Sequence, residues 1–218
     1  MEILLAIVSI LILVYSSILH EIAHGYVAYR LGDPTAKLLG RITLNPRPHI
    51  DPFMSLLVPI MVYIGSAGTF IFGGAKPVPV DPFNLRDGMK DLGLVSIAGP
   101  LTNILLAIVA SLITHVLFPG FGFNEIAISG FVGFIMTTII KWNLLLAALN
   151  LLPIPPLDGS KLFALLLPEK IAAAYLAIGN GGMGLLILLV LFYFPIGGFS
   201  LSTVLLALIT SGLTLLGF

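Results

Sequence analysis

Residues 3–29 read ILLAIVSILILVYSSILHEIAHGYVAY, an apolar run that is interrupted by the polar group HEIAH at positions 20–24. A helix that crosses a bilayer needs about 20 mainly apolar residues, and this run is long enough. No basic region precedes it and no small-residue cleavage site follows it, so we expect a retained helix rather than a secretory signal peptide. The stretch predicts a membrane protein whose first helix carries reactive side chains.

The composition of the whole chain agrees with this interpretation. Of its 218 residues, 58% are hydrophobic and 9% are charged, whereas soluble domains are about 25% charged. Ten basic and ten acidic residues balance, so no net charge favours nucleic acid or an acidic partner. Because cysteine is absent, histidines and carboxylates must bind any metal. Without linkers or repeats, we expect one domain over 1–218.

Further apolar segments predict an all-α polytopic membrane protein of about five transmembrane helices. Besides the first run, the candidate spans are 91–117, 129–151, 171–194 and 199–217. The segment 53–73 contains Pro59 and several glycines, a composition typical of a re-entrant element. We also expect a small cytoplasmic β element from residues 40–44 and 76–80. The alternating prolines of the second piece suit an edge strand, which can pair with an extended substrate.

The distribution of Lys and Arg predicts the orientation, because basic loops lie on the cytoplasmic side. The loop after the first helix and the stretches 75–90 and 158–170 contain basic residues, whereas 118–128 and 195–198 contain none. We therefore expect a multi-pass protein of the cell membrane, with its N-terminus outside and its C-terminus inside. His20 precedes Arg30 by ten residues, about 15 Å of helix, so the HEIAH group should lie in the cytoplasmic half of the bilayer.

The HEIAH group has the spacing of a zinc hydrolase site. His20 and His24 are four residues apart and project from one helix face, with Glu21 beside them. A charge near the middle of a bilayer costs about 3 kcal/mol, and a bound cation would compensate Glu21. The alternative is that these side chains only hydrogen-bond neighbouring helices.

Catalytic zinc usually has three protein ligands and one open position, so a third ligand is expected elsewhere. Asp158 is the best candidate, since the prolines of NLLPIPPL at 150–157 end a helix and force an extended segment before it. Asp158 can alternatively cap a short helix over 159–167. Glu169 is the other candidate carboxylate, and His49 is expected to be a loop residue with a gating or metal role as its alternative.

These motifs resemble those of the site-2 protease family of intramembrane zinc metalloproteases. HEIAHG at 20–25 is similar to the first motif of the family, and NLLPIPPLDG at 150–159 to the second, which includes the ligand aspartate. AGPLTN at 98–103 resembles a third shared element. GAKPVPV at 74–80 resembles a signature of the minimal branch, which lacks PDZ and CBS domains. The resemblance covers about residues 10–165.

The resemblance implies a metalloendopeptidase that cuts within or near transmembrane segments of membrane proteins, as in regulated intramembrane proteolysis. His20, His24 and Asp158 would bind one Zn²⁺ per chain, which lowers the pKa of its bound water towards about 7 so that Glu21 takes the proton. Asn150 would hold the substrate carbonyl or the developing oxyanion, or else only cap its helix. Asn103 would support the substrate or the site, or else only link helices.

The alternative function is a non-catalytic or transport-type metal-binding membrane protein. A transport route favours polar or ionisable groups along several helices. The segments 171–194 and 199–217 contain no charged residue, which disfavours transport. The expected partners are therefore transmembrane protein substrates and the lipid bilayer.

Overall fold

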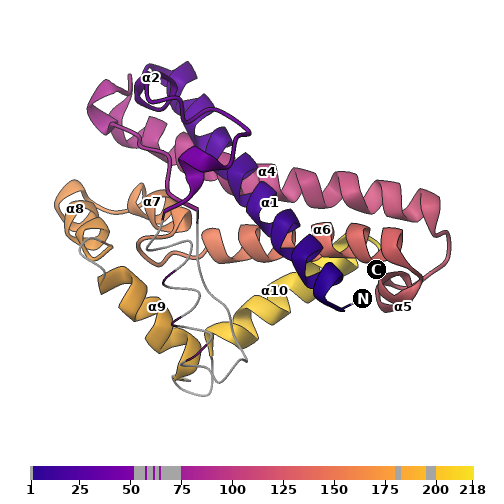
Figure 1. Cartoon of the computed structure of the whole chain (residues 1–218). Coiled ribbons are helices and arrows are strands. Elements are labelled where there is room, and N and C mark those ends of the chain that lie inside the picture. Colours follow the sequence, from indigo (N-terminus) through magenta and orange to yellow (C-terminus); the bar gives the residue numbers. More distant parts are fainter. Residues whose placement is uncertain are drawn as a thin grey trace.

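The computed structural model describes residues 2–51, 57, 61, 64, 75–179, 183–194 and 200–218. These residues form helices and connecting segments, and no strand occurs among them. Three helices are long and apolar enough to cross a membrane, namely α1 (Glu2–Leu31), α4 (Gly88–Leu117) and α6 (Phe131–Asn150) (Figure 1). The prediction of an all-helical protein with helices that can cross a membrane is confirmed, although three helices among the described residues meet this criterion where five were expected.

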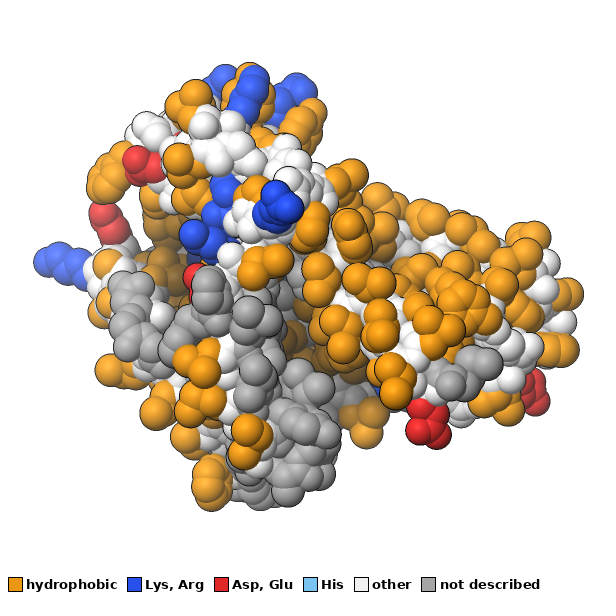
Figure 2. Space-filling model, in the orientation of Figure 1, with side chains coloured by type: hydrophobic (Ala, Val, Ile, Leu, Met, Phe, Trp, Pro, Cys, Tyr) orange, Lys and Arg blue, Asp and Glu red, His pale blue; other side chains and the backbone are white. Residues whose placement is uncertain are grey.

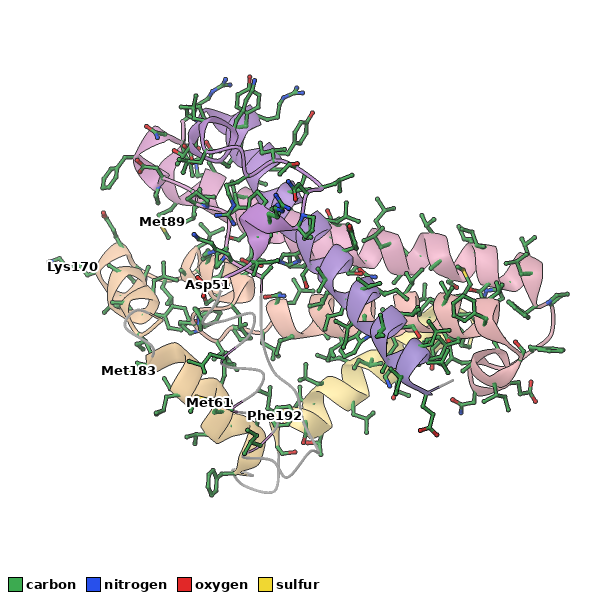
Figure 3. All side chains as sticks on the ribbon, in the orientation of Figure 1. Asp51, Met61, Met89, Lys170, Met183 and Phe192 are labelled. Carbon is green, nitrogen blue, oxygen red and sulfur yellow. The ribbon has the colours of Figure 1, made fainter. Side chains whose placement is uncertain are left out.

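Shorter helices connect and flank these three. On the side of the α1 C-terminus lie α2 (Thr35–Leu38) and the 3-10 helices η1 (Arg47–His49) and η3 (Pro82–Asn84). The remaining helices are α5 (Phe123–Ile128), α7 (Asp158–Ala164), α8 (Glu169–Ala177), α9 (Met183–Tyr193) and α10 (Leu201–Leu215). In Figure 3, Lys170 extends from α8 away from the other helices.

The three long helices pack through small and polar residues. α1 and α4 are antiparallel, since His24 contacts Val95 whereas His20 contacts Asn103 further along α4. α6 joins α1 through Trp142, whose indole nitrogen donates to Ser9 Oγ at 2.9 Å. Small side chains are buried along the three long helices, which lets helix backbones approach closely; they include Ala28, Ala98, Gly99, Ala107, Ala110 and Ala147.

Apolar side chains cover much of the outside of the long helices. Ile3, Leu105 and Leu112 are more than half exposed, as are many of their neighbours. Figure 2 shows hydrophobic side chains along this part of the molecule and a group of Lys and Arg at the end where α2 lies. In water such a surface would be unfavourable, but in a bilayer it contacts lipid, so the surface agrees with a membrane location.

The predicted β element is wrong, because neither 40–44 nor 76–80 is a strand. Pro77 and Pro79 have no amide hydrogen, so they cannot contribute to a ladder. The Arg41 guanidinium donates instead to the carbonyl oxygens of Lys76 and Pro77, at 2.7 and 3.2 Å. A side chain, rather than backbone pairing, therefore links the two pieces.

The predicted span 171–194 contains two helices, α8 and α9, rather than one. α8 ends at Ala177, and Gly179, a residue of low helix propensity, lies in the turn that follows. α10 is shorter than a typical span, at 15 residues. The predicted re-entrant segment 53–73 lies outside the described residues, apart from positions 57, 61 and 64.

The predicted placement of the termini on opposite sides is also wrong. The Leu216 carbonyl accepts a hydrogen bond from Ser111 Oγ at 3.1 Å, and the Phe218 ring contacts His115 with centroids 4.5 Å apart. The C-terminus therefore lies at the end of α4. Because α4 is antiparallel to α1, that end is on the side where α1 begins, and Figure 1 shows the termini near each other.

Candidate metal centre

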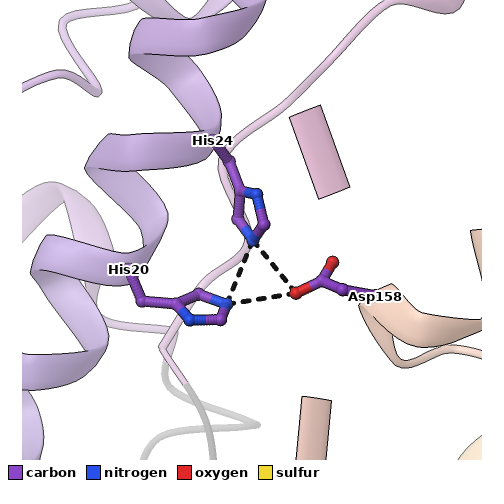
Figure 4. A group of neighbouring side chains, drawn as sticks. All are labelled: His20, His24 and Asp158. Atoms are coloured by element: carbon purple, nitrogen blue, oxygen red, sulfur yellow. Dashed lines mark hydrogen bonds and ion pairs between the residues drawn. The ribbon is translucent and has the colours of Figure 1, made fainter. Parts of the chain in front are cut away.

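Three predicted ligand side chains converge where α1 faces the start of α7. The Nε2 atoms of His20 and His24 are 3.0 Å apart, and each lies 3.1 Å from Oδ2 of Asp158 (Figure 4). The helical spacing of four residues points both imidazoles in one direction. All three residues are buried, each 6–7% exposed. The site therefore joins two parts of the sequence that are more than 130 residues apart.

The far ring nitrogen of each histidine faces a carbonyl oxygen. His20 Nδ1 lies 2.6 Å from Asn103 Oδ1, and His24 Nδ1 lies 2.7 Å from the carbonyl oxygen of Val95. A carbonyl oxygen only accepts, so both Nδ1 atoms must carry the proton. Each neutral imidazole then presents an unprotonated Nε2 to the centre of the cluster. This is the tautomer that binds a metal through Nε2.

The donor set fits a divalent metal ion. Two Nε2 lone pairs and a carboxylate oxygen meet without a hydrogen between them, an arrangement that is repulsive unless a cation lies among the three atoms. Zn–N and Zn–O bonds of about 2.0–2.2 Å would let His20, His24 and Asp158 hold one ion together. Nitrogen and oxygen donors of this kind suit zinc and leave a fourth position open.

Gly99 of α4 leaves the space that this cluster needs. A Cβ atom at this position would lie 2.5 Å from Nε2 of both His20 and His24. No side chain other than hydrogen fits there without displacing the imidazoles. Sequence reasoning did not assign this role to Gly99, although the AGPLTN element was the signal that could have identified it.

The chain around Asp158 explains its position. Gly159 packs so closely against the Leu151 carbonyl that an added Cβ would lie 2.3 Å from the oxygen. The alternative role of Asp158 as a helix cap is wrong, because α7 begins at Asp158 itself and its N-cap is Leu157. The carboxylate faces the histidines, and its Oδ1 pairs with Lys161 Nζ at 3.3 Å.

Glu21 lies next to the cluster in sequence and is held by a backbone amide. Its Oε2 accepts a hydrogen bond from Val78 N–H at 2.7 Å. The Val78 side chain lies over Gly25, where an added Cβ would be 3.0 Å from Val78 Cγ1. The segment 76–80, which Arg41 holds at its start, thus reaches the carboxylate beside the metal ligands.

The other candidate carboxylate and histidine lie elsewhere. Glu169 is exposed in the first turn of α8, and among the described residues the group that can hold a metal consists of His20, His24 and Asp158. His49 is 2% exposed, with its Nε2 2.9 Å from the carbonyl oxygen of Thr43. Its backbone carbonyl accepts from Lys76 N–H, so His49 helps to hold the segment 76–80.

The two asparagines with predicted roles in the site have different surroundings. Asn103 is fully buried and contacts His20, as a residue that supports the site would. Asn150 is half-buried in the last turn of α6, and its Nδ2 donates to the carbonyl of Leu146 at 3.0 Å. The side chain of Asn150 thus satisfies a carbonyl of its own helix, whose C-cap is the next residue, Leu151.

Comparisons with known proteins identify relatives of the same kind. YwhC of Bacillus subtilis, named as a candidate zinc metalloprotease, is 38% identical over 193 residues, which are 88% of this chain and 83% of YwhC. Rip2 of Mycobacterium tuberculosis, named likewise, is 34% identical over 81% of this chain and 63% of its own length. MJ0392 of Methanocaldococcus jannaschii, named as a zinc metalloprotease, is 27% identical over 73% of this chain and 34% of its own length.

The chain therefore spans less than two thirds of Rip2 and MJ0392, but most of YwhC. No family model and no solved structure matches the chain. The identity to YwhC extends over nearly all of both proteins, and the chain combines a HEIAH helix with a distant aspartate at one buried cluster. The protein belongs to the site-2 protease-like family of zinc metalloproteases.

Proposed function

We propose that this chain is an intramembrane zinc endopeptidase, with one Zn²⁺ bound by His20, His24 and Asp158 in a single domain over residues 1–218. The observation that carries the proposal is the buried triangle of ligand atoms, with sides of 3.0–3.1 Å. Two of its three residues, His20 and His24, lie on α1, which is long and apolar enough to cross a membrane. Buried charged and metal-binding groups at membrane depth mark functional sites, because their insertion is otherwise unfavourable.

The chemistry needs a base beside the ligands. When bound, zinc supplies a Lewis acid that polarises a carbonyl and makes water acidic enough to react near neutral pH. We assign Glu21 as the group that takes the proton from water and returns it to the leaving amine. Val78 N–H holds one oxygen of the Glu21 carboxylate, and we assign the proton transfer to the other.

Asn150 and Asn103 have separate proposed roles. Asn150 would hold the substrate carbonyl, for which its Nδ2 has to exchange the bond to Leu146 for one to the substrate. A donor of this kind is worth about 3–4 kcal/mol in other hydrolases. Asn103 supports the site through His20.

The proposed substrates are transmembrane proteins that are locally unwound at the cut. A helix shields its peptide bonds, so Gly, Pro or Asn near the cut would favour unwinding. An extended substrate can pair with backbone groups of the segment 76–80. We place this pairing at residues 78–80, because Arg41 already binds the carbonyls of Lys76 and Pro77.

We place the protein in the cell membrane, with its site in the cytoplasmic half. Supporting this orientation, Arg30 and Lys37 are exposed at the α1 end that follows the HEIAH group, in line with the preference of basic residues for the cytoplasm.

Metal analysis combined with proteolysis tests the proposal. Wild-type protein in liposomes should contain one zinc per chain and cleave a transmembrane peptide. Glu21→Gln should keep the zinc but lose activity by about 10²–10⁴-fold, whereas His24→Ala and Asp158→Ala should lose both. Bound zinc without any cleavage would favour the non-catalytic alternative. Zinc flux into the liposomes without cleavage would favour transport.

A further inference from the structure

Two fully buried asparagines on different helices form a chain of hydrogen bonds that ends at a metal ligand. Asn143 of α6 and Asn103 of α4 are both 0% exposed, and Asn103 Nδ2 donates to Asn143 Oδ1 at 2.8 Å. At the other end of the same amide, Asn103 Oδ1 faces His20 Nδ1 at 2.6 Å. Asn143 does not occur in any of the motifs around the metal ligands, and among the described residues its hydrogen bonds reach His20 through Asn103.

The direction of this chain is determined at its far end. Asn143 Nδ2 donates to the carbonyl of Ile139 and to Ser16 Oγ, both at 2.9 Å. A backbone carbonyl accepts and cannot donate, so the Asn143 amide must direct its nitrogen to Ile139 and its oxygen to Asn103. Asn103 must then donate towards Asn143, which directs its own oxygen to His20. His20 Nδ1 must therefore carry the proton, and its Nε2 is left unprotonated.

We propose that Asn143 is a positioning residue of the metal site, which sets the tautomer of His20 through the orientation of the Asn103 amide. The role of Asn143 in metal binding rests on the proposed function, but the hydrogen-bond chain exists whether or not the protein is a protease. It assigns to α6 a part in metal binding in addition to its packing against α1 and α4.

Loss of the acceptor on Asn143 changes which tautomer of His20 is favoured. Without it, the Asn103 Nδ2 retains, among the described residues, only a 3.5 Å hydrogen bond to the carbonyl oxygen of Ser16. Because that contact is long, the Asn103 amide can rotate and donate its Nδ2 hydrogens to His20 Nδ1. That orientation stabilises the tautomer with the proton on Nε2, which has no lone pair for the metal. Outer-shell partners of ligand histidines typically contribute 10–100-fold to metal affinity. Because Asn143 acts through a second residue, we expect the lower end, about tenfold.

The test compares three variants by ¹⁵N NMR of the metal-free histidines and by zinc competition with a chelator. Asn143→Leu removes the acceptor, and Asn143→Asp keeps an acceptor oxygen towards Asn103. Trp142→Phe removes the neighbouring link from α6 to Ser9 and leaves the asparagine chain intact. If Asn143→Leu does not fold, Asn143→Ser, which is too short to reach Asn103, replaces it. The chain contains four histidines, and His20→Gln assigns the His20 resonances.

We expect wild type, Asn143→Asp and Trp142→Phe to show protonated Nδ1 and unprotonated Nε2 at His20. Asn143→Leu should populate the other tautomer and bind zinc about tenfold more weakly. An unchanged His20 tautomer in Asn143→Leu would overturn the proposal, as would an equal loss of affinity in Trp142→Phe. A failure of this proposal can be distinguished from a failure of the proposed function. The tautomer of His20 is measured in metal-free protein, whereas zinc binding and cleavage by the wild type test the proposed function.

Discussion

The amide of Val78 donates a hydrogen bond to Oε2 of Glu21 at 2.7 Å, although the two residues are 57 positions apart. Val78 lies between Pro77 and Pro79, neither of which has an amide hydrogen. Residues 77–79 therefore have one backbone donor, the Val78 amide, and Glu21 accepts its hydrogen bond. The finding links the GAKPVPV element to the proposed base, a link that the sequence pattern alone does not reveal.

Val78→Pro should impair catalysis without loss of zinc. The substitution removes the N–H that holds Glu21 while keeping the backbone extended. Misplacement of a catalytic group by about 1 Å costs on the order of 10²-fold, so we expect kcat to fall by about 10–100-fold. Val78→Ala is the matched control, since it keeps the donor and should keep kcat within about threefold of wild type. Equal kcat values for Val78→Pro and wild type would show that Glu21 does not need this bond.

Arg41→Met should destabilise the folded protein. The Arg41 side chain is buried and binds two carbonyls of the segment 76–80, and loss of hydrogen bonds from a charged group costs about 1.5–3 kcal/mol. We expect a lower thermal midpoint in detergent, with zinc content retained. Arg47→Met is the control, because Arg47 is exposed. A midpoint for Arg41→Met that equals that of Arg47→Met would contradict the role of Arg41 as the link between the two pieces.

Gly99→Ala should abolish stable metal binding. The added methyl group would lie 2.5 Å from Nε2 of both histidines, so the imidazoles have to move apart. Gly93→Ala on the same helix is the control, since its methyl group would meet the end of the flexible Leu165 side chain at 2.6 Å. We expect zinc, measured by elemental analysis, in Gly93→Ala but not in Gly99→Ala. Full zinc occupancy in both would mean that the cluster is not the metal site.

Asp33 should make stability dependent on pH in the acid range. Burial alone would raise the pKa of this carboxyl, but hydrogen bonds from Thr35, from the Asp81 amide and from Asn84 outweigh burial and lower it. With a folded pKa below the unfolded value of about 3.9, the carboxylate stabilises the fold above that pH and loses this effect as pH falls through the folded pKa.

Asp33→Asn should therefore lower the thermal midpoint at pH 6 and show a smaller further decrease between pH 5 and pH 3 than wild type. Asp87→Asn is a suitable control, because Asp87 is more than half exposed and pairs with Lys90 at the surface. Identical acid profiles for wild type and Asp33→Asn would argue against stabilisation by the charged form.

Local sequence patterns singled out the three residues that the fold brings together at the candidate site. The four-residue spacing of His20 and His24 has a fixed consequence on any helix, and the prolines before Asp158 end a helix wherever it packs. Gly99 and Asn143 could not be assigned in the same way. Their roles depend on how α4 and α6 are positioned against α1, and this packing is not encoded in the pattern of any one segment.

The errors in the predicted fold have similar causes. The proline alternation in 76–80 did not reveal that a side chain, Arg41, would bind carbonyls of this segment. Hydropathy favoured a single span over 171–194 because apolar residues dominate the average. The glycines from 179 onwards weaken a helix locally, and an average over the whole segment underestimates that effect.

The most direct test of intramembrane proteolysis is to map the cut in a transmembrane substrate in liposomes by mass spectrometry. The proposed function predicts cleavage inside the apolar segment, towards its cytoplasmic end, with no such product from Glu21→Gln or after zinc removal. Cleavage confined to the soluble flank of the substrate, or the same product from Glu21→Gln, would contradict it.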